Sequence, residues 1–131
     1  MKLSATGALF GLGMALVTVK PAAAHHSFEA EYEDDRTATL TGIVTEIAWQ
    51  NPHAFIFLNT KTDDGATRQM RLELGPPYAL TRGGWKKDTV KIGDKITVEG
   101  AAVAKDPRNN WVGSLQTTML VLASGQKLPT R

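Results

Sequence analysis

The sequence predicts a small all-β domain with little helix. Three observations support this fold class. β-Branched and apolar residues alternate in short runs, turns rich in Gly, Pro and Asp separate those runs, and no long stretch after residue 24 has helical periodicity. Five such runs, with one short helix after the third, are typical of an OB-like small barrel. A small open sheet or a sandwich is the alternative arrangement of the same strands.

The first three strands are predicted between residues 37 and 74. Residues 37–47 are β-branched and alternating, and Gly42 marks a bend or bulge within them. Residues 54–59 are apolar on both faces, which favours a central strand. Residues 68–74 alternate again, and the alternation directs these side chains outward: Gln69, Arg71 and Glu73.

The remaining elements follow the break at Gly75-Pro76-Pro77. Residues 77–82 are predicted to form a helix of one or two turns that stops at Gly83-Gly84. Residues 95–104 are predicted to form the fourth strand. Residues 111–122 are predicted to form the fifth, with an interruption near Gly113.

The first 24 residues have the pattern of a secretory signal peptide. Lys2 provides a positive start, residues 5–18 are apolar and uncharged, and Ala22-x-Ala24 offers the small residues that a signal peptidase reads. The apolar run is shorter than the roughly 20 residues that a membrane-spanning helix needs. We therefore expect three segments: a cleaved signal (1–24), an extended or loosely ordered arm (25–36) and the OB-like domain (37–131). The mature protein is expected in the periplasm or secreted, with no membrane span.

Removal of this signal changes the charge of the chain. The precursor has 15 basic and 13 acidic residues, and the signal contains Lys2, Lys20 and no acid. The mature chain therefore has no net charge when its histidines are neutral, so the precursor's pI of about 9.0 does not indicate nucleic-acid binding. The chain also has no cysteine, which excludes disulfides, thiolate metal sites, c-type haem attachment and a cysteine nucleophile.

The three histidines form the most informative pattern. Cleavage after Ala24 would place His25 at the mature N-terminus with His26 beside it, whereas cleavage after Ala23 would leave one alanine before them. His53 follows the Asn51-Pro52 turn. An α-amine and imidazoles suit a transition metal, and tetragonal nitrogen ligation favours Cu(II), with zinc as the alternative. We therefore expect a metal-binding or metal-carrying protein with His25, His26 and His53 as ligands, which could serve another periplasmic metal or redox protein.

Several other residues are candidates for supporting roles. Glu46 and Glu73 are possible partners that orient a histidine, although such strand glutamates are commonly solvated. The acidic run from Glu29 to Asp35 favours a cation nearby, and its simpler interpretation is a solvated surface. Phe28 is a candidate anchor for the arm, or a residue that fills the barrel end.

Two further classes of function compete with metal binding. In the first, the protein is a non-metal binding module for a hydrophobic ligand or partner protein, with Trp49 and Trp85 on the recognition surface. Trp85 is the best candidate for an exposed recognition residue, whereas Phe55 and Phe57 are expected in the core. The second is an enzyme, which is less favoured because a domain of this size offers little surface to a substrate and no catalytic motif is present.

The sequence also resembles a family of small exported bacterial proteins of unknown function. The resemblance covers essentially the whole mature chain and is carried by His25-His26-Ser27-Phe28, by Trp49-x-Asn51-Pro52-His53, and by Glu73-Leu74-Gly75. Further matches are Arg82-Gly83-Gly84-Trp85, Gly93-Asp94 and Gly125-x-Lys127-Leu128, with one extra glycine at Gly83-Gly84. The resemblance implies export and a small β domain, and it implies no activity.

Overall fold

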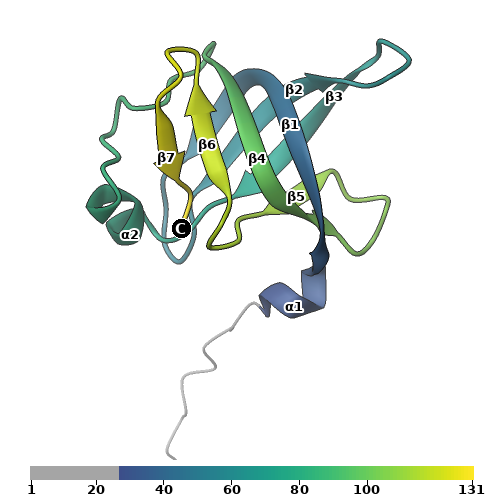
Figure 1. The fold of residues 1–131 in the computed structure, drawn as a ribbon, viewed down its shortest axis with the longest axis horizontal. Helices are drawn as coiled ribbons and strands as arrows, with labels where there is room; N and C mark the ends of the chain where they lie inside the picture. The colour runs from purple at the N-terminus through teal and green to yellow at the C-terminus, as the bar shows by residue number, and fades with distance from the viewer. Residues whose placement is uncertain (1–26) are drawn as a thin grey trace, which may run out of the picture.

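The computed structural model describes residues 27–131, and this part of the chain contains seven strands and two short helices. Figure 1 shows the strands wrapped into a barrel, with both helices toward the same end. In chain order the elements are α1 (Phe28–Glu31), β1 (Tyr32–Ala48), β2 (Phe55–Lys61), β3 (Thr67–Glu73), α2 (Pro77–Arg82), β4 (Lys95–Ala104), β5 (Trp111–Gly113), β6 (Met119–Leu122) and β7 (Lys127–Pro129).

The sheet closes because β1 pairs on both of its edges. The strand order is β1-β2-β3-β5-β4, and β4 pairs again with β1, which completes a five-stranded barrel. β3 and β5 run parallel, and the other strand pairs are antiparallel. β6 and β7 extend the sheet beyond β4. This closed barrel confirms the predicted OB-like fold class.

β1 is long and irregular, which allows it to serve two partners. Its pairing with β4 shifts register between Glu33 and Thr37 and again near Ala38, and its pairing with β2 shifts after Val44. Such bulges bend a strand and increase its twist, so one strand can turn around the barrel. Gly42 lies in the bent region, where a Cβ would be only 2.5 Å from the carbonyl oxygen of Asn59. The predicted bend at Gly42 therefore reflects a close backbone approach.

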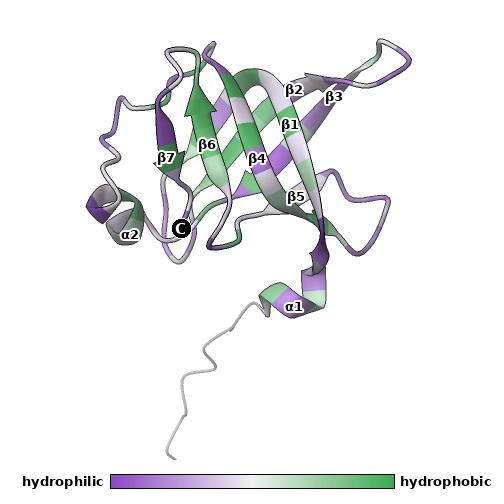
Figure 2. Ribbon diagram, in the orientation of Figure 1, coloured by the Kyte–Doolittle hydropathy of each residue, from purple (hydrophilic) through white to green (hydrophobic). Residues whose placement is uncertain are grey.

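One apolar core fills the barrel, and Figure 2 shows hydrophobic positions concentrated on its strands. Inward residues alternate with outward residues along β2 and β4, as the pleat requires. Complete burial of one such side chain is worth about 1.5–3 kcal/mol. The largest fully buried apolar side chains are Tyr32, Val44, Ile56, Leu58, Leu72, Leu74, Leu80, Ile96, Val98, Val112 and Leu120.

Several expectations about the elements need correction. Strand β1 begins at Tyr32 instead of residue 37, so residues 32–36 are extended, which is one of the two states expected for the arm, whereas residues 28–31 form the helix α1. The fifth strand is divided into β5 and β6, and β7 was not expected. Phe55 and Phe57 are half-buried outside the core, because Ile56 and Leu58 occupy the inward positions of β2. The predicted helix 77–82 and strand 95–104 have the bounds of α2 and β4.

Candidate functional site

A histidine and a buried glutamate meet at one end of the barrel. His53 lies just before β2, and Glu73 is the last residue of β3, where it pairs with Phe55. The Nδ1 atom of His53 is 2.6 Å from Oε1 of Glu73. Glu73 is 3% exposed, which corrects the expectation that it points outward. A carboxylate on Nδ1 fixes the tautomer and the orientation of the ring, with Nε2 on the side opposite to Glu73.

Tyr32 completes the hydrogen bonding of this carboxylate. Its hydroxyl donates to Oε2 of Glu73 over 2.7 Å, so each carboxylate oxygen has a named partner. Burial raises the pKa of the Tyr32 phenol well above its ordinary value, and the hydrogen bond and negative charge of Glu73 raise it further. Tyr32 is therefore a neutral hydrogen-bond donor to Glu73 at physiological pH.

Arg71 places a positive charge near the same group. Its guanidinium carbon lies 3.8 Å from the centre of the Trp111 ring and 5.1 Å from that of Phe55. The charge of Arg71 lowers the pKa of Tyr32, opposing the effect of Glu73. Two aromatic rings thus hold a cation close to the buried Tyr32 phenol.

Phe28 fixes the beginning of the described chain against this end of the barrel. Its ring lies 4.6 Å from the Tyr32 ring, centre to centre, and the two rings are tilted by 30°. A Cβ on Gly113 would be 2.6 Å from Cε2 of Phe28, so the ring packs directly on the glycine backbone. Phe28 therefore anchors this segment, as its position in the sequence suggested.

A cavity of about 110 Å³ lies beside the histidine–glutamate pair. The guanidinium of Arg131 lies 5.3 Å from the centre of the Phe28 ring, and its Nη1 donates to the Ser114 carbonyl over 3.0 Å. The Ser114 side-chain hydroxyl is buried and has no hydrogen-bond partner. Residues from both ends of the described chain and from three loops or strand ends line the cavity: Phe28, His53, Glu73, Leu74, Ser114 and Arg131.

The other expected site residues lie elsewhere. Glu46 is exposed on β1 and does not line this cavity. Trp85 is not exposed: it is 3% accessible, belongs to the core, and its Nε1 donates to the Pro129 carbonyl over 2.7 Å. Trp49 is half-buried, 6.2 Å from the Trp85 ring between ring centres. Its side chain lines a shallow depression with Ile47 and Lys87. His25 and His26 lie outside the described residues.

Sequence reasoning did not find Tyr32, Arg71, Ser114 or Arg131 as parts of the site. The sequence gives only a weak indication of these four residues, because each is a polar residue of a common type in a strand, a turn or a terminus and belongs to no recognisable motif. Only the closure of the barrel brings the start of β1, the end of β3 and the loop after β5 together. Glu73 was recognisable as a strand glutamate that could orient a histidine, whereas its burial was not expected.

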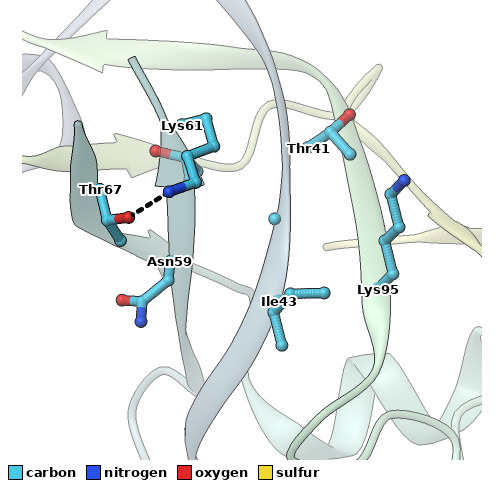
Figure 3. A pocket seen from close by; sticks show the side chains of 8 residues that line it. Thr41, Ile43, Asn59, Lys61, Thr67 and Lys95 are labelled. Carbon is cyan, nitrogen blue, oxygen red and sulfur yellow. Dashed lines mark hydrogen bonds between the residues drawn. The ribbon is translucent and has the colours of Figure 1, made fainter. Parts of the chain in front are cut away.

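A second concave surface lies at the opposite end of β2. This groove, of about 620 Å³, is lined by side chains of β1, β2, β3 and β4 that include Ile43, Lys61 and Lys95. Figure 3 shows Lys61 turned toward Thr67, to whose hydroxyl it donates over 2.8 Å. The groove contains neither Trp49 nor Trp85, and it holds no acidic or imidazole group.

Two further findings apply to residues 27–131. No group of three His, Asp or Glu side chains in this range is arranged to hold a metal ion. His53 and Glu73 therefore do not form such a group with a third residue of the described range. The same range contains no helix that is both long enough and apolar enough to cross a membrane.

The fold and the site define a small OB-like barrel protein with a Tyr–Glu–His array at one barrel end, in which Tyr32 and Glu73 are buried and His53 is partly exposed. The chain belongs to a family of unknown function, DUF6152, whose model matches residues 14–111. No curated protein and no solved structure is significantly similar to this chain.

Proposed function

We propose that this is an exported protein that binds or carries a transition metal, copper before zinc, through His25, His26 and His53. The observation that carries the proposal is the 2.6 Å contact between His53 Nδ1 and the buried Glu73 carboxylate. A histidine that binds a metal characteristically donates its second ring N–H to a carboxylate, which sets its tautomer and raises its basicity. A histidine that only completes a turn has no need of a buried carboxylate.

The position of Phe28 supports the participation of the two N-terminal histidines. Phe28 and His53 line the same small cavity. An extended chain covers at most about 3.3–3.6 Å per residue, so His26 begins within about 7 Å of Phe28 and His25 within about 10 Å. Both imidazoles, and an α-amine at His25 after signal removal, are then within reach of His53.

The ligand chemistry favours copper over zinc. An α-amine and imidazoles form an all-nitrogen set, which suits the tetragonal geometry of Cu(II). Structural zinc sites use four protein ligands and commonly include thiolates, and this chain contains no cysteine. The acidic residues Glu29, Glu31 and Glu33, which follow the histidines, add a negative potential that attracts a cation.

The same arguments extend to location and partners. We propose the periplasm as the site of action, because the first 24 residues have the pattern of a cleaved signal. A carrier with one exposed metal would exchange it with another periplasmic metal or redox protein. The alternative is a module that binds a hydrophobic ligand. It has less support because Trp85, its best candidate for an exposed recognition residue, is buried in the core.

Copper titration of the mature protein exported by a bacterial host tests the proposal. Native mass spectrometry should find a chain that begins at His25 with one copper retained. His53→Ala should weaken copper binding at least about tenfold, and Glu73→Gln should weaken it by about 10- to 100-fold. Glu46→Gln is the matched control, because it removes a carboxylate from an exposed position of the same barrel. No stoichiometric metal, or equal affinities in His53→Ala and the wild type, would refute the proposal.

The role of the α-amine needs its own variant. An additional residue placed before His25 in the mature chain keeps all three imidazoles and moves the amine away from the first of them. Copper affinity should fall, and the nitrogen splitting in the electron paramagnetic resonance spectrum should change. An unchanged spectrum would exclude the amine as a ligand and leave a site of imidazoles alone.

A further inference from the structure

The cavity beside His53 contains a polar group whose burial demands explanation. Ser114 is 3% exposed, and its Oγ atom has no hydrogen-bond partner. Leaving a hydroxyl buried in this state costs about 1–3 kcal/mol. Alanine at this position would avoid that cost because it has no hydroxyl. It would keep both backbone hydrogen bonds of this residue, which run from its N–H to the Glu73 carbonyl and from Arg131 Nη1 to its own carbonyl.

Arg131 adds further donor capacity to the same cavity. A guanidinium has five N–H groups, and one of them is used on the Ser114 carbonyl. Its position 5.3 Å from the centre of the Phe28 ring holds the charged group at the wall of the cavity. Arg131 and Ser114 thus offer a positive charge and a hydroxyl donor on one side.

The acceptors in the wall are already used. The Glu73 oxygens face His53 Nδ1 at 2.6 Å and the Tyr32 hydroxyl at 2.7 Å, so each carboxylate oxygen already has a donor. Backbone carbonyls around the cavity are also paired: the Gly75 carbonyl accepts from the Ala54 N–H over 3.2 Å, and the Glu73 carbonyl accepts from the Ser114 N–H over 3.0 Å. The cavity therefore offers donors in excess of acceptors.

We propose that this cavity binds a small monoanion of three or four heavy atoms, such as a short carboxylate, through Arg131 and Ser114. A volume of about 110 Å³ corresponds to three or four water molecules at about 30 Å³ each, which sets the size of the ligand. Phe28 and Leu74 cover its apolar side. The anion site is built from residues 28–131 and stands without a metal. A copper ion at His53 would attract the anion and tighten its binding. This part of the proposal rests on the proposed function.

Formate is the probe, and metal-free protein is the first sample. In an NMR titration, formate should shift the amide signals of Gly75, Ser114 and Arg131, whereas benzoate, whose ring exceeds the cavity, should not. Arg131→Gln should weaken formate binding about tenfold, because it removes a charge-assisted hydrogen bond. Arg108→Gln is the control, because Arg108 is an exposed arginine that is paired with Asp106 and does not line this cavity.

Ser114→Ala separates binding from folding. Without formate this variant should be as stable as the wild type or more stable, because it removes an unsatisfied hydroxyl, and it should bind formate about threefold more weakly. Water alone in the cavity would give no formate-dependent shifts, and that result would overturn the proposal. Equal formate affinity in Arg131→Gln and the wild type would overturn it as well.

Calorimetry on copper-loaded protein distinguishes this proposal from the proposed function. Formate binding that depends on Arg131 in a protein that retains no copper supports the anion site and refutes the metal site. Copper binding without formate binding refutes the anion site and leaves the metal site intact. Where both occur, formate should bind several-fold more tightly to the copper-loaded form.

Discussion

The packing of Phe28 on Gly113 gives the sharpest test of how the N-terminal segment is positioned. Alanine at residue 113 would place its Cβ 2.6 Å from Cε2 and 3.0 Å from Cζ of the Phe28 ring, and 3.0 Å from Cδ2 of Tyr32. Tyr32 is fully buried and bonded to Glu73, so the ring of Phe28 is the group that must move. Gly113→Ala therefore releases the anchor of the segment and leaves every proposed metal ligand in place.

The free-energy cost of Gly113→Ala follows from the overlap between the new Cβ and the Phe28 ring. Inserting a methyl group into a close-packed contact costs about 1–3 kcal/mol. If the docked segment is required for copper binding, up to this full amount appears as lost copper affinity, which is about 5- to 150-fold. The remainder appears as a lower free energy of unfolding.

Copper titration and urea denaturation of Gly113→Ala measure the two parts separately. Gly42→Ala is the control, because its Cβ would lie 2.5 Å from the Asn59 carbonyl oxygen in the bent part of β1, away from His53. Gly42→Ala should destabilise the barrel and leave the copper affinity of the folded protein unchanged. A Gly113→Ala protein that is destabilised but binds copper as tightly as the wild type would show that docking of Phe28 does not position the ligands.

Three further predictions concern the barrel. Trp85→Phe removes the 2.7 Å hydrogen bond to the Pro129 carbonyl and should lower the free energy of unfolding by about 1–2 kcal/mol in urea; no change would mean that water replaces the indole. Thr118→Val leaves the Leu115 N–H and the Gly100 carbonyl unpaired, and thermal denaturation should report a loss of about 2–4 kcal/mol. Because burial and Glu73 raise the pKa of Tyr32, the folded state keeps its phenol proton above about pH 10, where the unfolded chain loses it. The contribution of the Tyr32 phenol proton to the free energy of unfolding is fully present below about pH 10 and declines as pH rises above it. Raising the pH should therefore lower the free energy of unfolding less in Tyr32→Phe than in the wild type. In Tyr78→Phe, where Tyr32 is the remaining tyrosine, phenolate absorbance should appear only well above pH 10.

The predicted fold was correct where local pattern and tertiary position agree. Strand β4 and helix α2 have the expected bounds, because alternation and the Pro–Gly limits define them locally. The start of β1 was wrong because Glu33, Asp35 and Arg36 have the composition of a solvated segment. They continue the strand because Tyr32 and Glu33 pair with Ala104 and Val103 of β4. That pairing is set by barrel closure, which no local pattern reports.

The site was predictable in part for the same reason. His53 and Glu73 are 20 residues apart in the sequence, and each was recognisable as a candidate from its residue type. Their contact depends on the β2–β3 hairpin, whose register places Phe55 opposite Glu73. The burial of Glu73 breaks the expected alternation, because Leu72, Glu73 and Leu74 are all buried where β3 leaves the barrel. Trp85 was placed at the surface because Gly84 and Lys86 flank it, yet it closes the core beneath β7.

Stability alone does not explain the array at the end of the barrel. Burying a carboxylate against a histidine costs desolvation energy that their attraction only partly offsets, and apolar residues of similar size commonly serve stability as well or better. Here Tyr32 and His53 bond the Glu73 carboxylate, and Arg71 supplies a nearby positive charge. The arrangement holds Nδ1 of His53 against Glu73, with Nε2 on the opposite side of the ring. The result is a histidine of fixed orientation beside the start of the anchored segment, as the proposed metal site requires.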